Sequence, residues 1–138
     1  MKSARFEKLS NAAKKREFGG YHENAIKKHH HGNYNGIHYD SSWELAYIIY
    51  CLNYNIDIKR CNIVRYYEID GIRKKYFPDF IVNNEIIEIK GFYNNISKIK
   101  AEQNPDIKIL FKNDMKIYID YAISIYGKDF WNFNSTFT

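Results

Sequence analysis

Two short apolar segments, 79–82 and 85–90, flank the dipeptide Asn83-Asn84, and this arrangement limits the fold more than any other feature of the chain. Asparagine adopts the positive φ angles of a tight turn more readily than most residues with a side chain. We therefore predict a β-hairpin that folds back at the two asparagines. In that register Asp79 lies directly opposite Glu88, because the two residues are equally distant from the turn.

Lys90 belongs to the same hairpin and is expected beside these acids. Side chains two residues apart on a strand project from one face, so Lys90 shares the face of Glu88. Directly opposed Cβ atoms lie about 5 Å apart, and carboxylates at this distance repel unless a proton or a cation joins them. A divalent cation such as Mg²⁺ binds oxygen ligands of this kind. The alternative is structural: Lys90 forms an ion pair with Asp79 or Glu88 at a solvated hairpin tip.

The preceding residues indicate a helix and a second hairpin. Ser41 and Glu44 have the spacing of a capping box at the start of an apolar, buried helix that extends to about residue 53. A short extended segment is predicted at 56–58. Asp70-Gly71 then predicts a hairpin between strands 62–69 and 72–77, with Glu68 opposite Arg73.

The last third of the chain completes an α/β pattern. We predict a helix over 96–103, a strand over 107–111, and a final helix over 115–126 that Asn113 or Asp114 caps. The strand at 107–111 follows a helical crossover, so it should lie parallel to the strand at 85–90. The predicted order is helix, three-strand meander, helix, strand and helix, in a mixed central sheet flanked by helices.

The first 38 residues have a different character. Residues 1–40 contain eight Lys or Arg and four acids, whereas the whole chain has a net charge of +5. We divide the chain into a basic N-terminal arm, 1–38, in which 18–38 is a loop, and a compact domain, 39–138. A basic arm favours nucleic acid as partner. The residues expected to contact DNA are Lys14, Lys15, Arg16, Lys27, Lys28 and His38.

Some classes of protein are disfavoured by the composition. Cys51 and Cys61 are too few for a disulfide framework or a four-cysteine zinc site, and Cys51 is expected to be a buried, inert thiol. The run His29-His30-His31 could bind a transition metal, but a solvated basic loop is the favoured interpretation. No apolar stretch approaches the roughly 20 residues of a membrane helix, and no secretory signal is evident. We expect no membrane association and a cytoplasmic protein, or one inside a host cell if its source is a phage or virus.

Pro78-Asp79, followed after eight residues by Glu88-Ile89-Lys90, resembles the motif of the PD-(D/E)xK nuclease superfamily. The restriction-endonuclease-like core of that superfamily has the element order predicted above. The resemblance implies that Asp79 and Glu88 bind Mg²⁺, for which Mn²⁺ substitutes, that the Ile89 carbonyl is a third ligand, and that Lys90 is the catalytic lysine. Glu44 matches a first-helix glutamate that reaches the metal directly or through water. Its alternative role is the capping box with Ser41.

A narrower similarity covers segments 36–45, 76–80, 88–91 and 126–130. These resemble small stand-alone, homing-type endonucleases of phages and large DNA viruses. The similarity implies a site-directed endonuclease that acts on double-stranded DNA and leaves 5′-phosphate ends, with a homodimer as one route to a double-strand break. Two alternatives stay open: a Holliday-junction or branched-DNA resolvase of the same fold, and a non-catalytic DNA-binding module.

Overall fold

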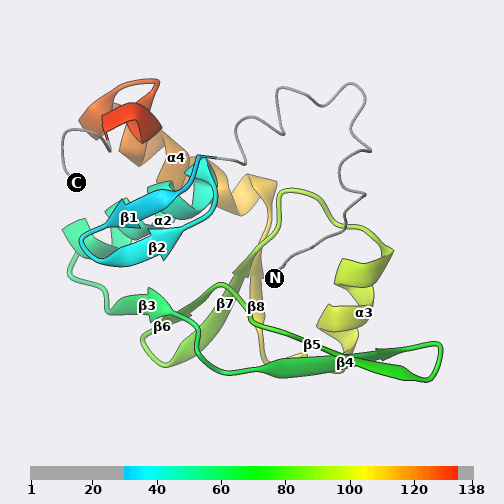
Figure 1. The fold of residues 1–138 in the computed structure, drawn as a ribbon. Helices are drawn as coiled ribbons and strands as arrows, with labels where there is room; N and C mark the ends of the chain where they lie inside the picture. Colours follow the sequence, from blue (N-terminus) through cyan, green and yellow to red (C-terminus); the bar gives the residue numbers. More distant parts are fainter. Residues whose placement is uncertain (1–29, 134–138) are drawn as a thin grey trace.

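The computed structural model describes residues 30–133, and a four-stranded mixed sheet lies at its centre (Figure 1). The strand order is β3 (Ile58–Arg60), β6 (Phe80–Val82), β7 (Glu85–Ile89) and β8 (Lys108–Leu110). The first three strands are antiparallel neighbours, and β8 is parallel to β7. The α/β class and the parallel placement of β8 are therefore confirmed.

The hairpin β6–β7 has the predicted register. Phe80 pairs with Ile87, and Val82 pairs with Glu85. Asn83 and Asn84 form the turn with φ angles of 50° and 70°, which asparagine tolerates better than most residues.

Two helices cover one face of the sheet (Figure 1). These are α2 (Ser42–Asn53) and α4 (Lys112–Tyr126). The main core joins them to alternate residues of β6 and β7, among them Phe80, Val82 and Ile87. The residues between, Ile81 and Ile86, belong to a smaller cluster on the opposite face. Because side chains alternate along a strand, Glu88 of β7 falls on the face of this smaller cluster.

A hairpin that the sequence analysis missed precedes α2. It consists of β1 (Gly32–Tyr34) and β2 (Ile37–Tyr39), joined by Asn35-Gly36 with positive φ at both residues. Tyr34 and Tyr39 are buried in the main core. The prediction of a loop over 18–38 is therefore wrong for 32–38. These residues belong to the folded unit rather than to a separate arm.

The Asp70-Gly71 hairpin forms as predicted but stands apart from the central sheet. It pairs β4 (Arg65–Ile69) with β5 (Ile72–Tyr76), and Glu68 lies opposite Arg73. It extends away from the sheet as a two-stranded ribbon, beside α3 (Asn95–Gln103) (Figure 1). The three antiparallel strands of the central sheet are thus β3, β6 and β7, and the ribbon separates β3 from β6 along the chain.

The helix ends follow side-chain capping. Ser41 is the N-cap of α2, and its Oγ accepts the backbone N–H of Glu44 at 3.2 Å, as predicted. Helix α4 begins at Lys112, earlier than predicted, after Phe111 as N-cap. The carboxylate of Asp114 accepts the Phe111 N–H at 2.9 Å, so this acid acts from inside the first turn. A short 3₁₀ helix, η3 (Phe130–Phe133), follows α4.

Helix length also bears on membranes. Within residues 30–133, none of the helices is long and apolar enough to cross a bilayer.

Candidate functional site

The carboxyl groups of Asp79 and Glu88 each accept a backbone N–H from the opposite strand. The backbone N–H of Asp79 donates to Glu88 Oε1 at 3.1 Å, and the backbone N–H of Ile89 donates to Asp79 Oδ2 at 2.8 Å. Each carboxyl group is therefore held by the backbone of the opposite strand. This pairing fixes both acids at the end of the β6–β7 hairpin that lies away from the asparagine turn.

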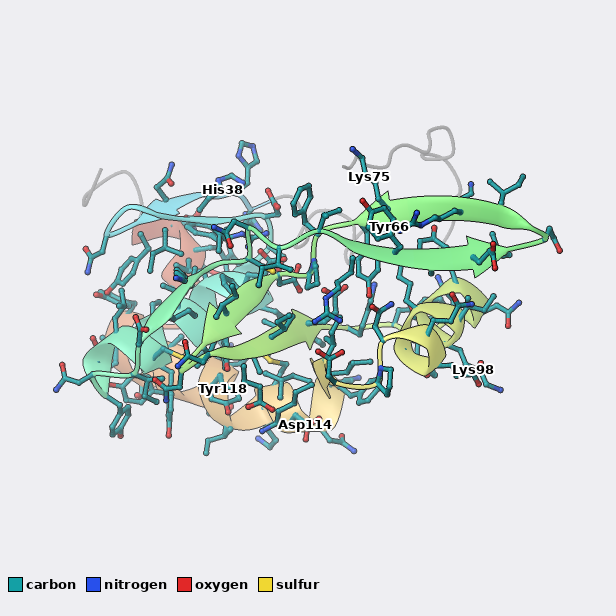
Figure 2. All side chains as sticks on the ribbon, turned by 90° about the horizontal axis from the view of Figure 1, so that it is seen from below. His38, Tyr66, Lys75, Lys98, Asp114 and Tyr118 are labelled. Carbon is teal, nitrogen blue, oxygen red and sulfur yellow. The ribbon has the colours of Figure 1, made fainter. Side chains whose placement is uncertain are left out.

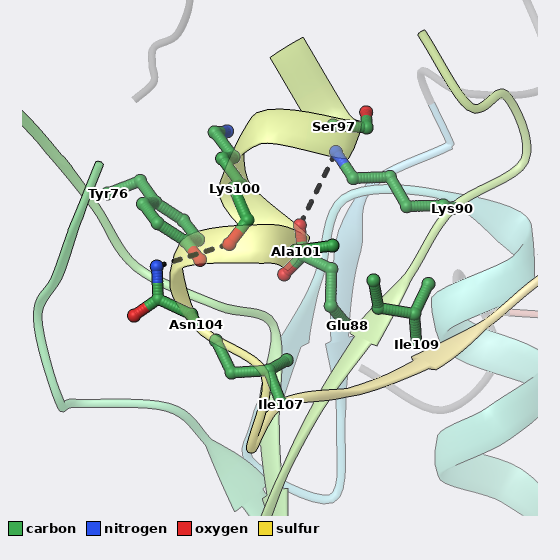
Figure 3. A pocket seen from close by; sticks show the side chains of 9 residues that line it. All are labelled: Tyr76, Glu88, Lys90, Ser97, Lys100, Ala101, Asn104, Ile107 and Ile109. Atoms are coloured by element: carbon green, nitrogen blue, oxygen red, sulfur yellow. Dashed lines mark hydrogen bonds and ion pairs between the residues drawn. The ribbon is translucent and has the colours of Figure 1, made fainter. Parts of the chain in front are cut away.

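Lys90 lies beside the same pair. Its Nζ is 3.4 Å from Glu88 Oε2 (Figure 3), and the two side chains are 24% and 12% exposed. The backbone N–H of Lys90 donates to the Leu110 carbonyl at 2.9 Å, which fixes the end of β7 against β8. The structure thus brings together the three side chains that the sequence placed on one face.

The backbone of Ile89 faces the carboxyl pair. Its N–H is directed at Asp79 Oδ2, and the N–H and C=O of one strand residue point to the same side. The Ile89 carbonyl is therefore directed toward the edge of β7 that carries Asp79.

Glu44 reaches this region from the first turn of α2. Its Oε1 accepts the Arg60 Nη1–H at 2.7 Å and the Asp40 backbone N–H at 3.0 Å. The capping interaction with Ser41 forms through the Glu44 backbone, but the carboxylate returns to Asp40 rather than to Ser41. Only the Ser41 half of the predicted capping box therefore forms.

Trp43 packs the start of α2 against the end of β7. A Cβ atom built on Gly91 would lie 3.2 Å from Trp43 Cζ3, which is closer than ordinary van der Waals contact. The absence of a side chain at Gly91 lets the indole approach the backbone that follows Lys90. This contact packs the helix that carries Glu44 against the backbone that follows Lys90.

Arg60 is a site residue that the sequence analysis missed. It lies opposite Phe80 on β3, with its guanidinium carbon 4.7 Å from the centroid of the Phe80 ring. It contacts the acids Glu44, at 2.7 Å, and Asp40, at 3.7 Å. No local pattern signals this role, because the partner Glu44 is on a different element and 16 residues away.

The electrostatics of the site disfavour a negative charge on Asp79. Burial, followed by the charges of Glu88 and Glu44, raises the Asp79 pKa well above its usual range. Arg60 and the Ile89 N–H act in the opposite direction without cancelling these effects. Burial also raises the pKa of Glu44, against the effect of Arg60. A cation placed between these acids would relieve the repulsion.

The donor set suits a hard divalent cation. Asp79 and Glu88 offer carboxylate oxygens, and Ile89 offers a carbonyl. Oxygen ligands of this kind suit Mg²⁺ or Mn²⁺ better than zinc. Within residues 30–133, the structure contains no group of three or more His, Cys, Asp or Glu side chains arranged to hold a metal ion. A bound metal would therefore rely on two carboxylates, the carbonyl and water, which is ordinary for Mg²⁺.

A small cavity adjoins Glu88 and Lys90 (Figure 3). Its volume is about 10 Å³, which is room for about one water molecule. The rest of its lining consists of Tyr76, Ser97, Lys100, Ala101, Asn104, Ile107 and Ile109. A cavity of this size cannot enclose an organic metabolite.

The residues expected to contact DNA are only partly described. His38 is exposed on β2, and its Nε2 lies 2.6 Å from Asp40 Oδ1. The other five residues of that prediction lie outside the described part of the chain: Lys14, Lys15, Arg16, Lys27 and Lys28.

Of the histidine run, residue His29 also lies outside the described part. The ring of His30 stacks on Trp131 with 4.7 Å between centroids, and His31 is exposed. Cys51 is a buried free thiol, and burial raises its pKa to about 11. It is therefore an unreactive thiol, as predicted.

Comparison with known proteins gives no relative for this chain. No protein-family model, no curated protein and no solved structure matches it.

Proposed function

We propose that this protein is a Mg²⁺-dependent DNA endonuclease of the PD-(D/E)xK type, with a restriction-endonuclease-like core. The observation that carries the proposal is the placement of Asp79 and Glu88, whose carboxyl groups accept the backbone N–H groups of Ile89 and Asp79, with Lys90 Nζ 3.4 Å from Glu88. The topology of the sheet supports the proposal, because β3, β6, β7 and the parallel β8 follow the strand order of the restriction-endonuclease-like core.

Each residue has a stated task. Asp79, Glu88 and the Ile89 carbonyl hold Mg²⁺, or Mn²⁺ in its place. The bound cation supplies positive charge to the phosphodiester as negative charge develops on it. Lys90 has three N–H donors with which to orient the attacking water against the phosphate. The water oxygen bonds to phosphorus, the bond to the 3′ oxygen breaks, and that oxygen takes a proton, which leaves 5′-phosphate and 3′-hydroxyl ends.

The purely structural alternative explains less. A Lys90–Glu88 ion pair needs only one acid, yet a second carboxyl group, Asp79, is held against the same pair. Burial and its neighbours raise the pKa of Asp79, so keeping an ionised carboxylate there opposes folding. A buried acid with a pKa perturbed in this way is characteristic of functional sites.

Glu44 is proposed to reach the metal through water. Arg60 holds its carboxylate at 2.7 Å, at the N-terminus of α2. In this role Arg60 is a positioning residue, because it acts through Glu44.

The proposed partner is double-stranded DNA, which the basic N-terminal residues would track. One active site cuts one strand, so a double-strand break calls for a homodimer or for two encounters. Cleavage at a chosen site, of the homing or restriction kind, is the form of activity that the motif segments favour.

Supercoiled plasmid tests the activity. With Mg²⁺ or Mn²⁺ we expect nicked or linear product whose 5′ ends accept radiolabel from a kinase only after phosphatase treatment. Direct labelling without phosphatase would contradict the proposed end chemistry. Competition between a four-way junction and a linear duplex of equal length distinguishes the endonuclease from the resolvase alternative. A resolvase would cut the junction in preference to the linear duplex.

A further inference from the structure

One face of the β4–β5 ribbon is open to solvent and carries cations and an aromatic ring. Residues that pair directly share a face, so the pairs Tyr66–Lys75 and Glu68–Arg73 define one face, here called the ribbon face. The Arg73 guanidinium carbon lies 3.9 Å from the centroid of the exposed Tyr66 ring. Figure 2 shows Tyr66 and Lys75 on the side of the ribbon away from Lys98 of α3.

The opposite face of the ribbon packs on α3. Lys100 Nζ lies 4.4 Å from the centroid of the Tyr76 ring and 5.3 Å from that of Tyr67. Tyr67 and Tyr76 alternate with the residues of the ribbon face. Helix α3 therefore covers this side and leaves the ribbon face as the open one.

Side chains of α3 and its C-cap also hold the outer edge of β4. Gln103 Oε1 accepts the Glu68 N–H at 2.7 Å, and its Nε2 donates to the Glu68 carbonyl at 2.9 Å. Asn104 Nδ2 donates to the Tyr66 carbonyl at 2.9 Å. These bonds occupy edge groups that another strand would need, so the ribbon is stiff and is not built for strand addition there.

The cations of the ribbon lie toward the candidate site. Arg73, Lys74 and Lys75 are consecutive on β5, with the acid Glu68 directly opposite Arg73 and Asp70 in the turn. From Lys75 the chain runs four residues to Asp79, which spans at most about 14 Å. That distance equals about four base steps of a DNA strand. A phosphate held at Asp79 and Glu88 would thus lie within about four base steps of Lys75.

The ribbon also has the dimensions of a groove-binding element. Paired strands lie about 4.8 Å apart, and the major groove of B-DNA, about 12 Å wide, admits a two-stranded ribbon. The major groove of duplex RNA is too deep and narrow for this. From these observations we propose that the ribbon face enters the major groove of duplex DNA next to the cut, with Arg73 and Lys75 against the phosphates that flank it. The DNA partner rests on the proposed function.

The test measures duplex binding in EDTA, without cleavage, by fluorescence anisotropy over a series of salt concentrations. We compare wild type with the double variant Arg73→Ala/Lys75→Ala. The matched control is Lys98→Ala/Lys116→Ala, which removes two exposed cations from α3 and α4. We expect the ribbon variant to bind about tenfold more weakly and its salt slope to fall by about 2, because each lost phosphate contact removes about 0.9 from the slope. The control variant should keep nearly all of the wild-type affinity and nearly all of the wild-type salt slope.

Several results would overturn the inference. The first is that the ribbon variant and the control variant bind with equal affinity and equal salt slope. The second is that wild type binds duplex RNA as tightly as duplex DNA. The third is that wild type does not bind duplex DNA. Thermal unfolding of the variants confirms that they fold. Plasmid cleavage by wild type is scored separately. If wild type cuts the plasmid but the ribbon variant binds DNA as tightly as wild type, only the proposed role of the ribbon face is rejected. If DNA binding depends on the ribbon face but wild type does not cut, only the proposed nuclease activity is rejected.

Discussion

At Asp79 the chain keeps an acid where burial, Glu88 and Glu44 all oppose its ionisation. The folded protein therefore binds a proton at Asp79 more tightly than the unfolded chain does. The stability that this proton provides is fully present below the unfolded pKa of about 4, and it is lost as the pH rises through the higher folded pKa. The metal-free protein should thus carry a measurable cost at neutral pH.

Asp79→Asn should remove that cost. The amide oxygen can still accept the Ile89 N–H, and the amide hydrogens can face Glu88, but no charge is buried. In EDTA, we expect the free energy of unfolding of the variant, relative to wild type, to increase as the pH rises from about 4 to about 8. Urea unfolding across this range measures the difference.

Asp106→Asn is the control of opposite sign. Asp106 is exposed, and its bidentate contact with Arg65 lowers its pKa. Its stabilising effect is present above the unfolded pKa and is lost as the pH falls through the folded pKa. This variant should therefore lose stability relative to wild type at neutral pH and converge with it in acid. If both variants showed the same trend, the explanation for Asp79 would be wrong.

The residues of the site differ in how far sequence predicts them. Asp79, Glu88 and Lys90 follow from a tight turn and a period of two, and both are local signals. Arg60 does not, because its contact with Glu44 depends on how β3 docks against α2. Long-range docking of this kind has no periodic signature in one sequence.

At the level of elements, capping and turn chemistry decide where the chain changes direction. Ser41 was predictable because an N-cap leaves a local pattern. Asn35-Gly36 also signals the β1–β2 hairpin. Its flanking strands are only three residues each, which is too short for a clear strand pattern in the sequence. The predicted start of α4 is later than the observed one, because Asp114, at the third helical position, resembles an N-cap in sequence.

Ser41→Ala tests the cap of α2. The loss of the Oγ acceptor leaves the Glu44 N–H without this bond and should lower the free energy of unfolding by about 1 kcal/mol. Ser124→Ala is the control, because Ser124 is exposed near the end of α4 and its change should stay within about 0.5 kcal/mol. Chemical denaturation gives both values, and equal effects would refute the importance of the cap.

Gly71→Ala tests the turn of the ribbon. Gly71 has a φ of 76°, and no neighbouring atom lies within 4 Å of the place that an alanine methyl group would take. The cost is therefore backbone strain of about 1 kcal/mol rather than a clash. Asp70→Asn is the comparison, because asparagine tolerates the φ of 53° found at Asp70. Hydrogen exchange should accelerate in β4 and β5 for the first variant only. Unchanged exchange there would mean that α3, rather than the turn, determines the ribbon's stability.

On the scale of the whole molecule, the candidate site lies where three units meet. The sheet provides the two acids and the lysine, α2 brings Glu44, and the ribbon leads into Asp79. A cation bound there would stabilise the folded state alone, by about 2.7 kcal/mol at a concentration 100 times its dissociation constant.

Adding Mg²⁺ to metal-free protein should therefore raise the melting temperature by several degrees at neutral pH. Asp79→Asn should remove most of this increase, because it removes one charged ligand. Lys98→Ala, on the side of α3 away from the ribbon face, should show the full increase (Figure 2). An equal shift in all three proteins would indicate a non-specific ion effect.

The most direct test of the central claim is plasmid cleavage by wild type and Lys90→Ala in parallel, each with Mg²⁺ and with EDTA, alongside Mn²⁺ binding by calorimetry. We predict that wild type cuts only with the metal, and that Lys90→Ala binds Mn²⁺ but cuts at least about 100-fold more slowly. If wild type left the plasmid intact with either metal, or if Lys90→Ala cut as fast as wild type, the account would be contradicted.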